Sequence, residues 1–219
     1  MGVKSNFVSV VSVGCFNPAI LTPQFLKEKC EFTAYSEPKG RTTPVATGLD
    51  YGSILFLLDL ERFQIKHSDL KRFQDSNIVT IMMDYLRVLQ HTPLDAIGVN
   101  LNYDIAGQPG GGLLKRLLEK EKALSEFLEL SESVTVHKVR RKIDEPGEII
   151  EVDLSGPLDE NTIERLNITA RNQSLRVNYN HEIKNLRKNR KLLARMKTDW
   201  PSLLDKDEQL RRSYFEEDK

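Results

Sequence analysis

The sequence predicts an α+β protein in which amphipathic helices pack beside one or two mostly antiparallel sheets. Three observations lead to this fold class. Short β-branched segments follow one another at the spacing of hairpins, one stretch has the period of an amphipathic helix, and a strand motif occurs twice. The chain has 219 residues, of which 39% are hydrophobic and 29% charged, so it can bury a core as one large domain or two small ones.

The first elements follow from β-branched residues, a capping pattern and turn-forming residues. Residues 7–16 are rich in valine and predict a strand, which an Asn-Pro pair ends. Thr22 followed by Pro23 is typical of a helix N-cap and the first helical residue, so we expect a short helix that ends near Cys30. Residues 36–44 contain proline and glycine and predict a loop.

Residues 53–66 open with an unbroken apolar run from position 54 to position 58. Such a run is typical of a strand that is buried on both faces. The segment therefore predicts either one such strand or one long strand with a bulge near residues 61–62.

Residues 75–90 predict the clearest helix of the chain. Asp75 or Ser76 can cap it, and a Thr-Pro pair at 92–93 ends it. At 100° per residue its apolar side chains share one broad arc, which we expect to be buried. These residues are Ile78, Val79, Ile81, Met82, Tyr85, Leu86, Val88 and Leu89.

The second part of the chain contains more hairpin signals than the first. A boundary is expected at the glycine-rich residues 107–112, which would link an N-terminal half, 1–106, to a C-terminal half, 113–219. Turn signals separate the elements of this part. We expect strands at 95–105, 133–143, 148–154, 163–170 and 174–183, and helices at 113–130, 184–197 and 207–215.

A seven-residue motif occurs in both halves. Residues 99–105 are Val-Asn-Leu-Asn-Tyr-Asp-Ile, and residues 177–183 are Val-Asn-Tyr-Asn-His-Glu-Ile, with four identical positions. The match predicts that two related halves arose by internal duplication. Both segments are then strands in equivalent positions of two superposable subdomains.

Strand alternation places the polar residues of this motif on one face. Two interpretations remain open. The face is either a solvated or inter-domain surface on which asparagines pair across strands, or a ligand or cation site with oxygen ligands from both segments. The residues concerned are Asn100, Asn102, Asp104, Asn178, Asn180 and Glu182.

Residue patterns for common catalytic and metal centres are missing from the sequence. The glycine run lacks the lysine and hydroxyl residue of a phosphate-binding loop. The four histidines lack the spacing of metal ligands, and no nucleophile elbow occurs. We therefore expect no metal, no cofactor and no catalytic residue, and an enzymatic role is disfavoured.

One loose pattern departs from this expectation. Asp50, followed on a later strand by Gln64 and Lys66, matches a nuclease-type arrangement in which a carboxylate holds Mg²⁺ and a lysine stabilises developing charge. Three residues are too few to make this more than a minor alternative. The expectation of no catalytic centre implies that their side-chain ends do not cluster.

Residues 184–197 contain seven basic residues and no acidic one, and we expect them to form an amphipathic helix. Its basic stripe is either a solvated face balanced by the acidic C-terminal tail, or a surface that binds an acidic protein or a nucleic-acid backbone. The stripe consists of Lys184, Arg187, Lys188, Lys191 and Arg195.

Charge and cysteine usage limit the functional classes. The 32 basic and 32 acidic residues balance, so polyanion binding would need a local surface. Cys15 and Cys30 are too few for a disulfide framework, and no apolar run reaches the roughly 18 residues of a membrane span, so we expect a cytoplasmic protein without membrane contact. The leading hypothesis is a non-enzymatic binding or assembly component that acts through a protein partner or as a homo-oligomer. The alternative is a nucleic-acid-binding or nuclease-type protein that uses residues 184–197.

Overall fold

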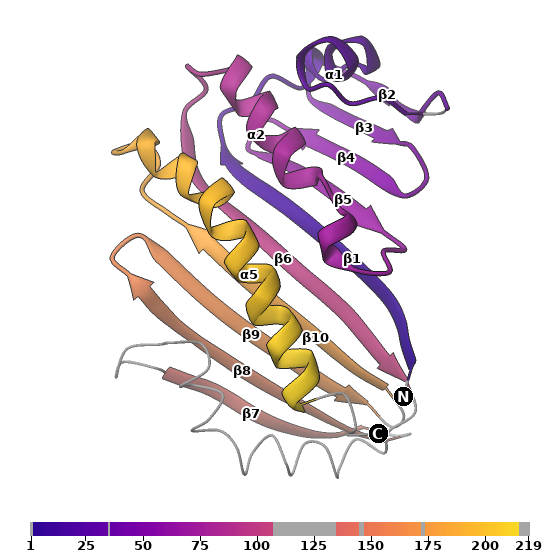
Figure 1. Ribbon diagram of the computed structural model, residues 1–219, viewed down its shortest axis with the longest axis vertical. Helices are drawn as coiled ribbons and strands as arrows, with labels where there is room; N and C mark the ends of the chain where they lie inside the picture. The colour runs from indigo at the N-terminus through magenta and orange to yellow at the C-terminus, as the bar shows by residue number, and fades with distance from the viewer. Residues whose placement is uncertain (1, 35, 107–134, 145–146, 172–173, 215–219) are drawn as a thin grey trace. The chain divides into compact units, whose positions relative to one another are not determined.

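The computed structural model describes residues 2–34, 36–106, 135–144, 147–171 and 174–214 (Figure 1). The fold is α+β, with a large antiparallel sheet and three α-helices among the described residues. This confirms the predicted fold class at that level. The chain forms two compact units, each built from separate stretches. Unit 1 comprises Met1–Asn6, Asn100–Glu182 and Leu203–Lys219, and unit 2 comprises Phe7–Val99 and Ile183–Ser202.

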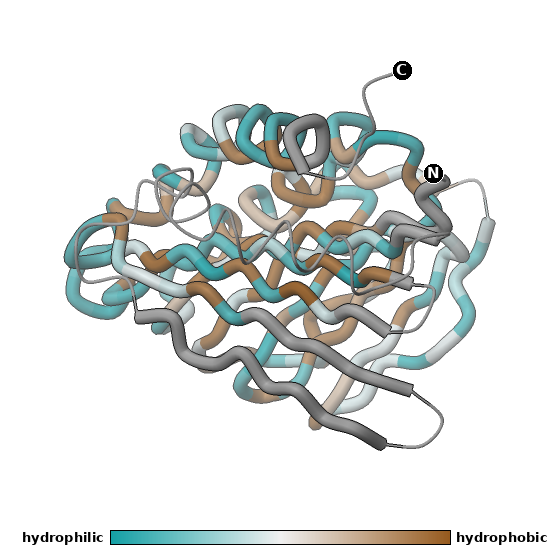
Figure 2. The backbone as a smooth tube through the Cα atoms, turned by 90° about the horizontal axis from the view of Figure 1, so that it is seen from below, coloured by the Kyte–Doolittle hydropathy of each residue, from teal (hydrophilic) through white to brown (hydrophobic). Residues whose placement is uncertain are grey.

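Unit 2 contains a six-stranded arrangement in the hydrogen-bonded order β2-β3-β4-β5-β1-β6. Strands β1 and β6 extend into unit 1. Hydrophobic and hydrophilic residues alternate along the strands, so that one face of each strand supplies the core (Figure 2). The strands are β1 (Gly2–Gly14), β2 (Lys39–Thr42), β3 (Ala46–Asp50), β4 (Ile54–Asp59), β5 (Arg62–Ser68) and β6 (Leu94–Ala106).

Two helices of unit 2 cover the apolar face of these strands. Helix α1 (Pro23–Lys29) begins as predicted, because the Thr22 Oγ1 accepts a hydrogen bond from the Phe25 backbone N–H at 3.1 Å. Helix α2 (Ile78–Val88) packs against β5 (Figure 1) and buries six residues of the predicted apolar arc. The predicted caps of α2 are wrong, since its N-cap residue is Asn77, which makes no side-chain capping bond.

Aromatic side chains form the centre of the unit 2 core. Phe63 of β5 is completely buried and lies between Phe16 and Tyr85, with ring centroids 6.3 and 4.5 Å away. Tyr85 of α2 also meets Phe25 of α1 in an edge-to-face contact. One aromatic cluster therefore joins both helices to the sheet.

The sequence prediction for residues 36–66 is wrong in three places. Strand β2 lies within the predicted loop, β3 was not predicted, and residues 53–66 form the hairpin β4–β5 rather than one long strand. The Asp59 side chain explains the hairpin, because its Oδ1 accepts hydrogen bonds from the backbone N–H groups of Glu61 and Arg62 at 2.9 and 2.7 Å. This turn folds the apolar run back on itself.

Gly40 accounts for the misjudged strand β2. Its φ angle is +123°, and a Cβ atom there would lie 2.0 Å from the backbone oxygen of Gly48 on β3. Only glycine permits this approach of the two backbones. Because residues 36–44 contain proline and glycine, which are typical of loops, the sequence did not indicate the short strand β2.

Unit 1 contains the order β6-β10-β9-β8-β7. Strands β7 (Thr135–Asp144), β8 (Gly147–Asp159), β9 (Thr162–Arg171) and β10 (Ser174–Ile183) confirm the two predicted strand pairs. Strand β8 is longer than expected, because it continues through a Gly-Pro pair and shifts register between Pro157 and Asp159. The predicted glycine linker at 107–112 and helix at 113–130 lie outside the described residues, so the division into halves stays a prediction.

The predicted basic helix at 184–197 is wrong. Residues 184–189 are not helical, a 3-10 turn covers Arg190–Leu192, and helix α5 begins at Leu193 and runs to Tyr214. Asn185, with a left-handed φ of 61°, accepts backbone hydrogen bonds from Lys188 and Asn189 in a turn. Helix α5 also includes the separately predicted C-terminal helix, because it continues through Pro201.

The hairpin register of unit 2 predicts unequal effects of two substitutions. Phe63 is 0% exposed, whereas Leu57, on the other strand and the other face of the same hairpin, is 43% exposed. Phe63→Ala should lower the free energy of unfolding by about 3–5 kcal/mol, since it leaves a cavity in the aromatic cluster. Leu57→Ala should cost less than about 1 kcal/mol. Urea unfolding followed by circular dichroism measures both, and equal losses would contradict this register.

Candidate functional site

Four neighbouring strands of unit 1 present a polar surface, which we call the polar strand face. Its residues alternate with apolar residues on the opposite face, such as Leu101, Tyr103, Leu166, Val177 and Tyr179, each no more than 2% exposed. The surface includes all six polar residues of the repeated motif. Its members are Asn100, Asn102, Asp104, Asp153, Ser155, Arg165, Asn167, Arg176, Asn178, Asn180 and Glu182.

The two copies of the motif lie on neighbouring strands, β6 and β10. The Asn178 amide donates to the Asn102 Oδ1 at 2.7 Å, and the Asn180 amide donates to the Asn100 Oδ1 at 3.0 Å. The asparagines of the motif therefore pair across strands, one of the arrangements that the sequence left open. Both segments are strands, as the repeat predicts, but residues 100–105 and 177–182 both belong to unit 1, on neighbouring strands, and not to two separate subdomains.

Arginines neutralise the two carboxylates of the motif. Arg176 Nε donates to the Asp104 Oδ1 at 2.8 Å, and Arg165 forms an ion pair with Glu182. The hydrogen bond and the charge of Asp104 raise the pKa of Arg176. Among the residues that the structure describes, no group of three metal-ligating side chains forms. The motif carboxylates therefore act as partners of arginine.

Sequence reasoning missed both arginines. The signal that could have found Arg176 is strand alternation, because it lies two residues before Asn178 and so on the same face. Arg165 lies on β9, and only the pairing of strands brings it to Asn180 and Glu182.

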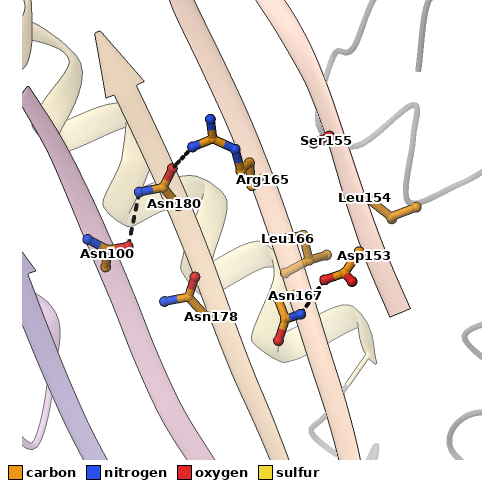
Figure 3. A pocket seen from close by; sticks show the side chains of 9 residues that line it. All are labelled: Asn100, Asp153, Leu154, Ser155, Arg165, Leu166, Asn167, Asn178 and Asn180. Carbon is orange, nitrogen blue, oxygen red and sulfur yellow. Dashed lines mark hydrogen bonds between the residues drawn. The ribbon is translucent and has the colours of Figure 1, made fainter. Parts of the chain in front are cut away.

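A hollow of about 410 Å³ lies in the polar strand face, over β6, β10, β9 and β8 (Figure 3). Arg165 donates to the Asn180 Oδ1 at 2.9 Å, and Asn180 in turn donates to Asn100. At the other end of the hollow, Asn167 donates to Asp153. The hollow is lined by Asn100, Asp153, Leu154, Ser155, Arg165, Leu166, Asn167, Asn178 and Asn180.

The opposite face of the same strands contains a buried ionic cluster. Glu164 of β9 is 0% exposed, and its Oε1 contacts the His181 Nδ1 at 3.2 Å and the Lys206 Nζ at 3.5 Å. Lys206 belongs to the C-terminal part of α5, which lies over β9 and β10 (Figure 1). The cluster thus attaches this part of α5 to the sheet of unit 1.

The carboxyl of Glu164 keeps its charge in this buried setting. Desolvation would raise its pKa, but hydrogen bonds from His181 and Tyr179 and the charge of Lys206 outweigh that effect, so the pKa lies below its ordinary value. With His181 2% and Glu164 0% exposed, the cluster is enclosed. Its chemistry suits attachment of the helix.

The predicted basic stripe does not form one helical face, since only Arg195 of the five residues lies in α5. Arg187 is paired with Asp95, and its Nη2 lies 3.7 Å from the Cys15 Sγ. Arg195 lies 3.9 Å from Asp199. The remaining members are lysines, of which Lys188 and Lys191 are exposed and Lys184 is half-buried.

Arg190, which lies within the same segment, has an internal role. Its Nη1 donates to the Thr92 backbone oxygen at 2.5 Å, and its Nη2 donates to those of Leu86 and Leu89 at 3.0 and 3.3 Å. Leu86 and the C-cap residue Leu89 lie at the C-terminal end of α2, where helices leave carbonyl groups without intrahelical donors, and Thr92 lies in the turn that follows. Partial burial lowers the pKa of the guanidinium.

The nuclease-type residues lie on the unit 2 sheet. In the strand register, Asp50 is opposite Leu55, which is opposite Lys66, so two strand spacings, about 9–10 Å, separate the backbones of Asp50 and Lys66. The Asp50 Oδ1 accepts the Gly52 N–H at 2.7 Å, and the Lys66 Nζ lies 4.2 Å from the centre of the Phe7 ring. Each group therefore has a local partner.

Comparisons with known proteins add no assignment to this geometry. Neither a protein-family model nor a curated protein matches the chain. Within the described part of the chain, no helix has both the length and the apolar character needed to cross a membrane.

The Glu164 cluster predicts a pH-dependent stability. A folded-state pKa below the unfolded value adds stability that is present above the unfolded pKa and is lost as the pH falls through the folded pKa. Glu164→Gln should cost about 3 kcal/mol at neutral pH, since Lys206 loses its buried counter-ion, and should abolish the decline in stability that the wild type shows as the pH falls below 4.5, the ordinary glutamate value. Urea unfolding between neutral and acidic pH provides the measurement.

The exposed Glu160, in the neighbouring β8–β9 turn, supplies the control for this experiment. Glu160→Gln should change the free energy of unfolding by less than about 0.5 kcal/mol. If the Glu164 variant were as stable as the wild type at neutral pH, the cluster would not anchor α5.

The Arg190 contacts predict a second stability difference. Arg190→Met keeps an apolar stem but removes the charged donor from three carbonyls, and should lower the free energy of unfolding by about 2–3 kcal/mol. Lys191→Met, at the exposed neighbouring position, should cost less than about 0.5 kcal/mol. Thermal or urea unfolding compares them, and a silent Arg190 variant would refute the structural role.

Proposed function

We propose that this chain is a non-enzymatic binding component that acts through a protein partner, and that the polar strand face is the surface that meets this partner. The observation that carries the proposal is a hollow of about 410 Å³ in which asparagines are the largest group, four of the nine lining residues. Amides donate and accept hydrogen bonds but do not ionise in the neutral pH range. Such a set of groups suits recognition rather than acid–base chemistry.

The charge of this face supports a protein partner over a polyanion. Among its residues, the carboxylates of Asp104, Asp153 and Glu182 outnumber the guanidiniums of Arg165 and Arg176 by three to two. Nucleic-acid surfaces need an excess of basic groups to neutralise phosphates. A slightly acidic, hydrogen-bonding surface lacks that driving force.

Nucleic-acid binding or nuclease activity through residues 184–197 remains the second candidate. Exposed Lys188 and Lys191 favour it. It is weakened because Arg187 is paired with Asp95 and Arg190 donates to backbone carbonyls. Dissociating either arginine from its partner would cost free energy before a phosphate could bind.

Three further expectations belong to the proposal. Origin of the two motif segments by duplication is supported by their shared strand conformation and matching polar positions. The protein partner could also be a second copy of this chain, in which case the assembly is a homo-oligomer. A reducing, cytoplasmic setting is supported by Cys15 and Cys30, which form no disulfide.

Removal of amide groups from the polar strand face tests the proposal. The double substitution Asn178→Ala and Asn180→Ala should reduce capture of the partner by about tenfold or more, which corresponds to at least about 1.4 kcal/mol. Affinity capture from the native cell after mild cross-linking, quantified by mass spectrometry, measures partner proteins. Light scattering over a range of concentrations measures self-association.

Asn77→Ala is the matched control, because Asn77 is an exposed asparagine of unit 2 without a capping bond. It should leave capture and self-association unchanged. Undiminished capture by a folded double variant would exclude the polar strand face as the binding surface. Retention on DNA that is lost on Lys188→Glu and Lys191→Glu would favour the second candidate instead.

A further inference from the structure

We propose that the hollow in the polar strand face binds an extended, uncharged peptide segment through alternate carboxamide side chains, that is, asparagine or glutamine. This inference rests on the proposed function, because it names the chemistry of the partner segment. It is carried by the directions of the existing hydrogen bonds, the charge pairing at the hollow and the spacing of its amides.

The amide side chains of the hollow have hydrogen-bonding capacity beyond the bonds they make. Asn178 donates to Asn102 and Asn180 donates to Asn100, which uses one N–H of each donor and one oxygen of each acceptor. Within the described residues, the bonds found for Asn178 do not use its Oδ1, and those found for Asn100 do not use its Nδ2. An acceptor and a donor therefore remain on neighbouring strands of the hollow (Figure 3).

A carboxamide complements this pair best, because it offers one donor group and one acceptor group side by side. A carboxylate only accepts, and an ammonium group only donates. A charged ligand would also meet groups that are already paired. Arg165 is engaged by Asn180 and Glu182, and Asp153 accepts from Asn167.

The spacing of the amides matches an extended chain. Asn178 and Asn180 are two residues apart on β10, and alternate residues of a strand are about 6.6–6.8 Å apart. A peptide that runs along β10 in the same extended conformation repeats its own side chains at that interval. Alternate carboxamides then face successive asparagines, as in the amide ladders of stacked strands.

The lining of the hollow disfavours ring-shaped ligands. Its nine lining residues include no aromatic side chain, so a sugar or base has no stacking surface there. Its volume of about 410 Å³ lies within the range of specific ligand sites, about 300–1,000 Å³. An extended segment that inserts two or three side chains fits this open shape better than an enclosed small molecule.

The test uses three capped pentapeptides with the full-length protein. They are Gln-Thr-Gln-Thr-Gln, Glu-Thr-Glu-Thr-Glu and Lys-Thr-Lys-Thr-Lys, each acetylated and amidated. Binding is followed by the shifts of asparagine side-chain amide signals in nuclear magnetic resonance spectra. We expect saturable binding of the glutamine peptide with a dissociation constant at or below about 1 mM, and binding of both charged peptides at least about tenfold weaker.

Variants assign the binding to the hollow. Asn178→Asp replaces the amide by a carboxylate of nearly equal shape and should weaken the glutamine peptide by about tenfold or more. Asn178→Ala tests the same loss if the aspartate variant does not fold. Asn77→Ala, outside the hollow, should bind the glutamine peptide like the wild type.

Three results would overturn the inference: no binding of the glutamine peptide up to about 1 mM, binding of the glutamate or lysine peptide as tight as that of the glutamine peptide, or unchanged binding by both Asn178 variants. Failure of the peptide while partner capture still depends on Asn178 and Asn180 would refute only the inference. If the glutamine peptide does not bind and partner capture does not depend on Asn178 and Asn180 either, the proposed function is refuted as well.

Discussion

Every residue of a β-strand lies on one of two faces, and in unit 1 the two faces have opposite requirements. On β10, Val177 and Tyr179 are buried in the core, whereas Asn178 and Asn180 bond to asparagines of β6. A slip of one residue would bury the amides and expose the apolar side chains together. The pairing of β6 with β10 is therefore specified from both sides of the sheet, and the asparagine pairs and the Arg176–Asp104 ion pair depend on this register.

The buried cluster shows how the attachment of α5 depends on the pairing of β9 with β10. Glu164 and His181 face α5 because they occupy positions that alternate with Arg165 and Glu182 of the polar strand face. One strand pair thus carries the enclosed Glu164–His181 contact on one side and the solvent-accessible Arg165–Glu182 ion pair on the other. Removing one member of the enclosed cluster would be destabilising, because it would leave a buried charge without compensation. The accessible pair mainly sets the charge of the surface.

The sequence predicted those elements whose pattern is local. The apolar arc of α2, the capping threonine of α1 and the alternation of the motif strands need only neighbouring residues, and each appears in the structure. The hairpin β4–β5 was missed because its turn depends on one side chain, Asp59, within an apolar context. The helix at 184–197 was misjudged because basic residues at helical spacing also occur in a segment whose arginines bind distant groups.

The candidate site was predictable in its composition but not in its geometry. Alternation placed the six polar motif residues on shared faces, and cross-strand asparagine pairs were among the expected arrangements. Which strands are neighbours is a long-range property, so Arg165, Asn167 and Asp153 could not be assigned to the same surface. The same holds for Lys206, which reaches Glu164 from a helix 42 residues further along the chain.

Strand β2 has a consequence for how molecules of this chain meet. It is the edge strand of unit 2, only four residues long, and it carries Lys39, Gly40 and Arg41. An incoming strand from another molecule would find few backbone groups, an irregular backbone at the glycine and two positive charges. Natural sheets use short and charged edges in this way to resist fibril growth. Unit 2 is thus protected at this edge against uncontrolled polymerisation.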